Sequence, residues 1–303
     1  MSENFPTLRL HARRGDVVAR DGVVVSFFIP YDHSIVAQAC WRALQTYLRA
    51  TPPQSLNWYG ADDGDVLELD EDGWEVIRKR MVDRPSRLAW HVELSDLPGG
   101  TGGYQFEYHS NRIERPLCVG SNTAMSFTFP TEYLLEHGPQ RMRDLVLELA
   151  RELPFHFGYA SFGLASREGS WTAGDWKVLE KYSVRYLGVD LPAVAGLGSV
   201  IGLHSLGAHW LTFLGSPLLE RMGGTEALRQ ALPFPEVSLL PMEQERLLVT
   251  LSEWPTAIDI EQEPIPPQYR ALACFLKPFM YAPEDADDGI ANYLDRWRRR
   301  LCP

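Results

Sequence analysis

The chain has 303 residues, of which 45% are hydrophobic and 23% are charged, so it can bury a large core and is not an intrinsically disordered protein. The 29 lysines and arginines stand against 40 aspartates and glutamates, which gives a formal net charge of −11 at pH 7. This charge disfavours a general nucleic-acid binder or membrane-surface binder, because both of those partners are themselves anionic. The length suits a single domain over residues 1–303, with 1–168 and 169–303 as candidate subdomains.

Four cysteines stand far apart in the chain and form no CxxC pair: Cys40, Cys118, Cys274 and Cys302. This spacing predicts four reduced thiols and argues against a disulfide framework or a zinc site. The N-terminus has no apolar segment typical of a signal peptide, and the longest apolar run, Val23–Pro30, is too short to span a bilayer. We therefore expect a soluble cytoplasmic protein that binds no metal and no cofactor.

The first elements are a strand and a helix. The β-branched and aromatic run Val23–Ile29 follows a turn and predicts a buried strand. Apolar residues at three- and four-residue spacing then predict a helix that begins at an N-cap, Ser34, and ends at Thr51.

The strongest charge anomaly follows this helix. Its acidic residues are Asp62, Asp63, Asp65, Glu68, Asp70, Glu71, Asp72 and Glu75. Such a run is usually a solvated loop, because like charges repel one another and stay at the surface. The functional alternative is an acidic surface that attracts a basic partner. Trp58 and Tyr59 lie in the loop just before this run, and we expect them to be an exposed aromatic pair.

The rest of the chain adds more strands than helices. Alternating segments at 88–94, 104–108 and 125–129 predict an antiparallel meander with one buried and one solvated face, turning first at the glycines of 99–103. The later elements are expected at 131–152 (a helix split at Gly138-Pro139), 156–164 (strand), 175–187 (helix), 210–214 (strand), 216–224 (helix), 237–240 with 247–251 (hairpin), 267–279 (helix) and 287–301 (helix). The class is α+β, a mainly antiparallel sheet with helices packed on one side, and the element order allows two loosely similar halves.

Catalytic patterns are missing or incomplete. The segment GYASFG at 158–163 lacks the GxSxG spacing of a nucleophile elbow. His91-Val92-Glu93 matches half of a zinc-deaminase signature, but the cysteine half is missing. His204 and His209 are five residues apart, which is wrong for two metal ligands on one helical face. The sequence therefore favours a protein that is not an enzyme, and an enzyme with an unrecognised acidic or metal site stays open as an alternative.

Three segments resemble the TsiV-like immunity proteins of type VI secretion systems, a family long described only as a domain of unknown function. The segments are YLGVDL at 186–191, AHWLTFLGSPLLERMGG at 208–224 and PPQYRALACFLKP at 266–278. The resemblance covers residues 20–282 and rests mainly on the WLTFLG motif, which is structural in character. Two departures are His209, where the family pattern has asparagine before the tryptophan, and the unusually acidic segment Pro255–Pro264.

The resemblance implies a cytoplasmic antidote that binds an antibacterial type VI effector, often a nuclease, and blocks its DNA site. The acidity, the many aromatic residues and the lack of a catalytic pattern agree with this implication. The candidate partner-binding residues are Trp58, Tyr59, Asp62, Asp63, Asp65, Glu68, Asp70, Glu71 and Asp72, followed by Asp259, Glu261 and Glu263. A third hypothesis is a repressor of its own operon that binds DNA through Arg296 and Arg298 to Arg300.

Overall fold

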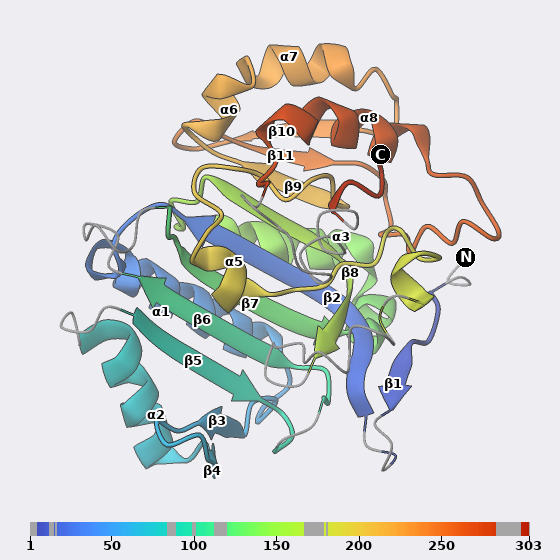
Figure 1. Cartoon of the computed structure of the whole chain (residues 1–303). Helices are drawn as coiled ribbons and strands as arrows, with labels where there is room; N and C mark the ends of the chain where they lie inside the picture. Colours follow the sequence, from blue (N-terminus) through green and yellow to red (C-terminus); the bar gives the residue numbers. More distant parts are fainter. Residues whose placement is uncertain are drawn as a thin grey trace.

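In the described part of the chain, eleven strands form one antiparallel sheet (Figure 1). The structure is a computed structural model, and it describes residues 5–11, 15, 17–83, 89–98, 101–111, 120–166, 179, 181–282 and 298–302. Across the sheet the strands lie in the order β10 (Ser238–Met242), β11 (Arg246–Thr250), β9 (Leu211–Leu214), β8 (Phe157–Ser166), β2 (Val17–Ile29), β7 (Thr123–Pro130), β6 (Gln105–Asn111), β5 (Ala89–Ser95), β3 (Trp58–Gly60) and β4 (Val66–Glu68), while β1 (Arg9–His11) pairs with β2.

Strand β2 lies at the centre of the sheet, because β7 pairs with one of its edges and β8 with the other. All residues of Val23–Ile29 are fully buried, so this strand needs apolar or hydrogen-bonded side chains on both faces. The one polar member, Ser26, satisfies this condition through a 3.0 Å hydrogen bond between its Oγ and the Oγ of Ser126 on β7. The predicted buried strand is confirmed, and it begins six residues earlier than predicted, at Val17.

Helices α1 (His33–Ala50) and α3 (Thr131–Ala150) cover one face of the sheet with a continuous apolar cluster. The N-cap of α1 is Asp32, whose carboxylate accepts a 2.9 Å hydrogen bond from the Ser34 N–H, so the predicted cap at Ser34 is wrong by two residues. The predicted break in α3 is confirmed at Gly138, whose φ of 79° is a left-handed conformation that glycine adopts without a steric penalty.

The opposite face of the sheet carries further helices (Figure 1). They are α5 (Val194–Gly198), α6 (Leu218–Arg221), α7 (Gly224–Ala231) and α8 (Pro267–Leu276), the last followed by a 3-10 turn at Lys277–Phe279. Leu272 and Leu276 of α8 belong to the same apolar cluster as Leu247 and Val249 of β11. The predicted packing of helices on one side thus describes α1 and α3, and the second half of the chain adds a layer on the other face.

Strands β5, β6 and β7 are consecutive antiparallel neighbours, which confirms the predicted meander. The predicted solvated face is wrong for β6 and β7, because Glu107 and Ser126 of that face are only 6% and 2% exposed. Burial raises the pKa of the Glu107 carboxyl to about 7. Residues 175–178 and 180 of the helix expected over 175–187, residues 287–297 of the helix expected over 287–301 and residues 99–100 of the turn at 99–103 lie outside the described residues.

The two parts of the chain build the two sides of the same sheet. Outward from the central pair β2 and β8, one side runs β7-β6-β5-β3-β4, all within residues 1–168, and the other side runs β9-β11-β10, all within residues 169–303, while β8 itself belongs to residues 1–168. The predicted β10–β11 hairpin is confirmed by five residue pairs from Ser238↔Thr250 to Met242↔Arg246. Among the described helices, none combines the length and the apolar character that crossing a lipid bilayer requires.

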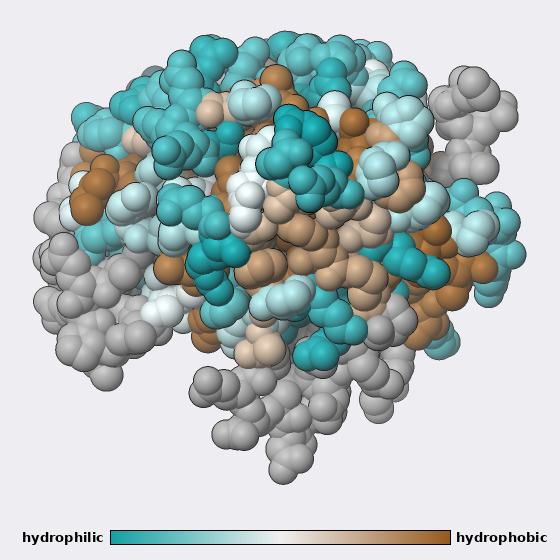
Figure 2. All heavy atoms as spheres, turned by 90° about the horizontal axis from the view of Figure 1, so that it is seen from above, coloured by the Kyte–Doolittle hydropathy of each residue, from teal (hydrophilic) through white to brown (hydrophobic). Residues whose placement is uncertain are grey.

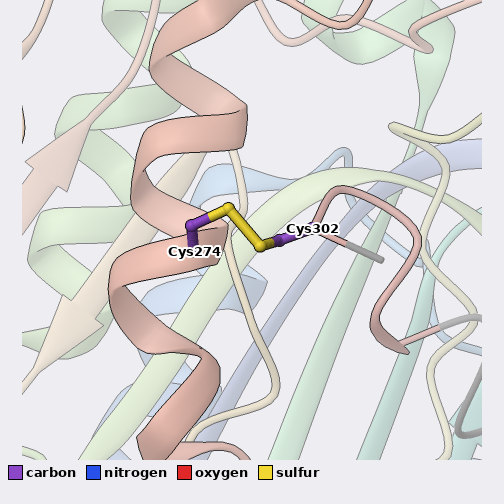
Figure 3. Close-up of a disulfide and its surroundings, with 2 residues drawn as sticks. All are labelled: Cys274 and Cys302. Carbon is purple, nitrogen blue, oxygen red and sulfur yellow. A yellow bond between two sulfur atoms is a disulfide. The ribbon is translucent and has the colours of Figure 1, made fainter.

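A disulfide joins Cys274 of α8 to Cys302 near the C-terminus (Figure 3). The two Cα atoms lie 5.3 Å apart, which is a usual separation for a disulfide. The prediction of four reduced thiols is therefore wrong for this pair, because the chain returns to α8 after 28 residues and the spacing alone does not show that return. Cys40 is reduced and buried, and burial raises the pKa of its thiol to about 12. Cys118 lies outside the described residues.

His156 makes the fold sensitive to acid. The ring is fully buried, its Nε2 lies 3.1 Å from the His204 carbonyl oxygen, and burial lowers its pKa from 6.5 to about 4. The unfolded chain binds a proton on this histidine below about pH 6.5, whereas the folded protein does so only near pH 4. We expect the free energy of unfolding to fall by about 2–3 kcal/mol between pH 7 and pH 4 through this group alone.

The measurement is urea unfolding of the wild type and of His156→Gln at several pH values. The variant is expected to lose stability less steeply with acid than the wild type over this window. Parallel curves would show that His156 does not titrate differently in the two states.

Candidate functional site

The acidic run builds one edge of the sheet. We call residues 58–72 the acidic edge: strand β3, the loop after it, the edge strand β4 and the start of helix α2 (Glu71–Arg78), which a π-helical turn at Lys79–Asp83 follows. The register pairs Trp58 with Glu68 and Gly60 with Val66. The prediction of a loop is therefore correct only for residues 61–65, since strands and a helix hold the other charges in place.

Trp58 and Tyr59 point to opposite faces of β3, because side chains alternate along a strand. Tyr59 is 8% exposed and packs in the core, where the guanidinium carbon of Arg80 lies 5.8 Å from the centre of its ring. Trp58 is partly exposed and shares a face with Glu68. The prediction of an exposed aromatic pair is thus wrong for Tyr59 and applies only to Trp58.

Three carboxylates of the acidic edge are used by the fold. Asp62 forms a 2.9 Å ion pair with Arg80, a buried side chain that also donates a 2.6 Å hydrogen bond to the Gly60 carbonyl. Asp63 accepts a 3.2 Å hydrogen bond from the Asp65 N–H and so shapes the loop. Asp70 is the N-cap of α2 and accepts a 2.8 Å hydrogen bond from the Gly73 N–H.

Four further carboxylates are exposed, and no ion pair or side-chain hydrogen bond reaches them from anywhere in the described residues: Asp65, Glu68, Glu71 and Asp72. Glu71 and Asp72 lie in the first turn of α2, where negative charge is favourable. The structure thus divides the acidic run into carboxylates that hold the fold and carboxylates that are available to a partner.

Replacing the cap residue tests this division. Asp70→Ala is expected to lower the free energy of unfolding by about 1 kcal/mol, because the Gly73 N–H loses its acceptor. Asp72→Ala, two residues away and without a partner among the described residues, is expected to change it by less than about 0.5 kcal/mol. Urea unfolding monitored by tryptophan fluorescence measures both. Equal effects would contradict the capping role of Asp70.

A groove of about 750 Å³ opens beside these carboxylates, between the end of α1, the β3–β4 hairpin and the start of α2. Its lining includes Leu48, Pro52, Pro53, Trp58, Glu68, Leu69, Asp70, Glu71 and Trp74. The volume lies in the range of ligand pockets, and the lining as described contains no lysine or arginine. Sequence analysis missed Leu48 and Trp74, because only the fold brings the end of α1 next to α2.

The second acidic segment is largely neutralised within the protein. The Arg185 guanidinium holds Asp259 with two hydrogen bonds of 2.9 and 2.6 Å and reaches Glu261 at 2.7 Å. The Arg185 hydrogen bonds also hold the pKa of the Asp259 carboxyl below its usual value. Glu263 accepts a 3.3 Å hydrogen bond from the Thr256 hydroxyl. Asp259 therefore serves mainly to fix this turn, and Glu261 and Glu263 contribute exposed charge.

The two acidic segments do not form one surface. Residues 186–190 connect the second segment to β8, through backbone bonds to residues 257 and 258 and a bridge between Asp190 and Gly163. Five strands of the sheet lie between β8 and β4. At about 4.8 Å per strand this corresponds to roughly 25–30 Å. A single docked domain can cover the acidic edge without the second segment.

The other end of the molecule, over α6, α7 and α8, presents hydrophobic patches among hydrophilic residues (Figure 2). A groove of about 530 Å³ lies there between α7 and β10, lined by Arg229, Leu232, Pro233, Phe234, Pro235, Val237 and Leu239. Leu240 on β10 is 45% exposed. This apolar surface is a second feature that the sequence analysis did not identify.

The side chains considered for catalysis and for DNA binding make contacts with other residues of the protein. His91 and Glu93 are neighbours on one face of β5, with Nε2 and Oε1 3.2 Å apart. Within the described ranges, no group of three or more histidine, cysteine, aspartate or glutamate side chains is arranged to hold a metal ion. His209 is buried and pairs with Asp190 at 2.7 Å, and Arg300 donates to the same carboxylate at 2.7 Å. Arg300, proposed for DNA binding, is therefore part of the core.

Comparison with curated proteins finds no match. Among solved structures, a Pseudomonas aeruginosa T6SS protein, PA0821, has a TM-score of 0.80 and 18% sequence identity, over 97% of this chain and 87% of that chain. At this identity the likeness shows a shared fold. The family model described as "Type VI immunity for VRR-NUC" matches residues 39–301, which is most of the chain. The chain therefore belongs to the TsiV family of type VI immunity proteins.

Proposed function

We propose that this immunity protein neutralises a basic nuclease effector by docking its acidic edge over the effector's DNA-binding cleft. The observation that carries the proposal is the set of four exposed carboxylates that the fold leaves unpaired beside a groove, among the described residues: Asp65, Glu68, Glu71 and Asp72. A nuclease cleft must hold phosphates and is therefore basic. The acidic edge offers the same sign of charge as DNA.

Charge and packing make separate contributions to such a complex. The net charge of −11 and the acidic edge accelerate encounter with a basic surface. Slow release needs desolvated contacts, which Trp58 and Trp74 at the groove supply. We expect a one-to-one complex with an interface of about 1,600 Å² or more. The protein acts by binding and not by catalysis, in the cytoplasm, where a DNA-cleaving effector finds its substrate.

The test begins with co-expression of this protein and the effector encoded beside its gene. We expect bacterial survival, a co-purified one-to-one complex and loss of DNA cleavage. The variant Asp65→Asn/Glu68→Gln/Glu71→Gln/Asp72→Asn is then compared with the wild type by calorimetry at several salt concentrations. We expect its affinity for the effector to fall about 10- to 100-fold at low salt and its salt dependence to weaken.

A matched control uses the second acidic segment. Glu261→Gln/Glu263→Gln removes two exposed charges roughly 25–30 Å away and is expected to change the affinity less than about threefold. Equal losses of affinity in the two variants would show that the effect comes from the net charge of the protein and not from the acidic edge. Unchanged affinity in the fourfold variant would overturn docking through the acidic edge.

The two competing hypotheses, an enzyme and a repressor, are not supported by a comparable structural observation. The enzyme hypothesis needs a rigid group of ligands or catalytic side chains, whereas the exposed carboxylates of the acidic edge stand without such an arrangement in the part of the chain that is described. The repressor hypothesis needs a cluster of exposed arginines. Arg299 is exposed and Arg298 is partly exposed, whereas Arg300 is engaged with Asp190 and with the Leu187 carbonyl, and Arg296 lies outside the described residues.

A further inference from the structure

The groove beside the acidic edge combines aromatic rings with carboxylates, and its lining among the described residues includes no lysine or arginine. Trp58 and Glu68 are directly opposite each other in the β3–β4 register, so their side chains lie on the same face of the hairpin. Trp74 and Glu71 line the same groove from α2. Neither Glu68 nor Glu71 has an ion-pair partner in the described part of the chain.

At two other places in this protein, an aromatic ring and a carboxylate together bind an arginine side chain. On the core side of the hairpin, Arg80 lies 5.8 Å from the Tyr59 ring centre and pairs with Asp62 at 2.9 Å. At the second acidic segment, Arg185 lies 5.0 Å from the Tyr186 ring centre and pairs with Asp259 at 2.6 Å. In both places a guanidinium lies over an aromatic ring and binds a carboxylate. In the described residues, the groove has the aromatic rings and the carboxylates, but no guanidinium group lies among them.

We propose that the groove is an arginine-binding site: it receives an arginine side chain from a loop of the effector, between the two tryptophans and the Glu68 and Glu71 carboxylates. This inference rests on the proposed function for the identity of the partner and names the chemistry of one anchor in its interface. The groove is larger than one side chain, so the residues that flank the arginine in the loop enter with it.

Arginine suits this site better than lysine. Its planar guanidinium stacks on an indole face and donates two parallel hydrogen bonds to a carboxylate, and it loses less hydration on burial than an ammonium group. Asp70 already accepts from the Gly73 N–H, so Glu68 and Glu71 are the acceptors for the incoming group. An arginine that enters a tryptophan-lined pocket also has the composition of a binding hot spot.

A test that needs no effector uses N-acetyl-argininamide as the probe. Indole N–H signals of the 15N-labelled protein are assigned to Trp58 and Trp74 with Trp58→Phe and Trp74→Phe, and the probe is then titrated. We expect saturable shifts of these two signals. N-acetyl-citrullinamide, which has the same shape without the charge, is expected to cause none, and N-acetyl-lysinamide is expected to bind at least about fivefold more weakly.

Two charge variants test which carboxylates bind the arginine side chain. Glu68→Gln/Glu71→Gln is expected to weaken binding of N-acetyl-argininamide at least about fivefold. Asp63→Asn/Asp65→Asn removes the same charge from the same edge, at residues outside the groove lining, and is expected to change it less than about twofold. Both variants alter exposed side chains, and their far-UV spectra are expected to match the wild type.

The proposal is overturned if the argininamide produces no saturable shift, if the citrulline compound binds equally, or if the two variants weaken binding to the same degree. These outcomes concern the groove alone. Failure of the effector to co-purify would overturn the proposed function and leave an arginine-specific groove intact, so the two proposals fail in different experiments.

Discussion

Replacing Asp190 by asparagine is expected to lower the free energy of unfolding by about 3–5 kcal/mol. Asp190 is 1% exposed, and its two oxygens bind different side chains: Oδ2 lies 2.7 Å from His209 Nδ1 and Oδ1 lies 2.7 Å from Arg300 Nη2. Burial by itself would raise the pKa of this carboxyl, but His209 and Arg300 outweigh burial and lower it. Removing the charge takes away the carboxylate that holds the buried Arg300 side chain at 2.7 Å, and removing one partner is the costly way to break a buried ion pair.

Urea unfolding at pH 7 measures this loss, and Asp72→Asn, at an exposed aspartate without a side-chain partner among the described residues, is the control with an expected change below about 0.5 kcal/mol. Because folding lowers the pKa of Asp190, its contribution is present above the unfolded pKa of about 3.9 and is lost as the pH falls further. The wild-type and Asp190→Asn curves are therefore expected to converge in strong acid. A decrease in the free energy of unfolding below about 1 kcal/mol at pH 7 would show that the contacts of Asp190 with His209 and Arg300 are not a main source of stability.

Removing the Cys274–Cys302 disulfide is expected to destabilise the protein by about 3.5 kcal/mol, because the cross-link closes a loop of 28 residues and restricts the unfolded chain. The folded state depends on this closure as well, since the end of the closed loop, just before Cys302, places Leu301 in the core and Arg300 on Asp190. Cys274→Ser, Cys302→Ser and the double variant are expected to lose the same amount, and a thiol reductant is expected to bring the wild type to their level. Unequal single variants, or a loss below 1 kcal/mol, would contradict this account.

The state of this disulfide in cells bears directly on where the protein works. Cytoplasmic thiols are kept reduced, whereas the periplasm is oxidising. Alkylation of free thiols in freshly lysed cells, followed by mass spectrometry of the Cys274 and Cys302 peptides, measures the oxidised fraction. A reduced pair agrees with the proposed cytoplasmic action on a nuclease. A fully oxidised pair would place the protein in the periplasm and would require an effector that acts there.

The sequence shows where the acidic residues cluster, but it does not show which of their carboxylates bind other residues of the protein. The acidic run and Trp58 are visible as a charge cluster beside an aromatic residue. The roles of the carboxylates depend on Arg80, which follows Asp62 by 18 residues and reaches back to it from the π-helical turn after α2. The burial of Tyr59 depends on which face of β3 meets the core, and a three-residue strand carries too few positions to show that alternation.

The contacts of His209 are also visible only in the structure. Its neighbours in sequence do not reveal a partner, whereas in the structure it pairs with Asp190, 19 residues earlier, and stacks on Tyr159 with ring centres 4.1 Å apart. The histidine thus belongs to a buried network that ties residue 209, residue 190 and the C-terminal Arg300 together.

The sequence by itself determined the elements and the class of this protein. Periodicity of two and of 3.6 residues marks strands such as β5 and helices such as α1, because burial of one face imposes that spacing locally. Tertiary structure alone decided what joins residues far apart in the chain: the Cys274–Cys302 disulfide, the ion pairs of Asp190 and the groove between α1 and α2. Those contacts join segments that carry no local signal for one another, so the spacing of residues in the sequence does not reveal them.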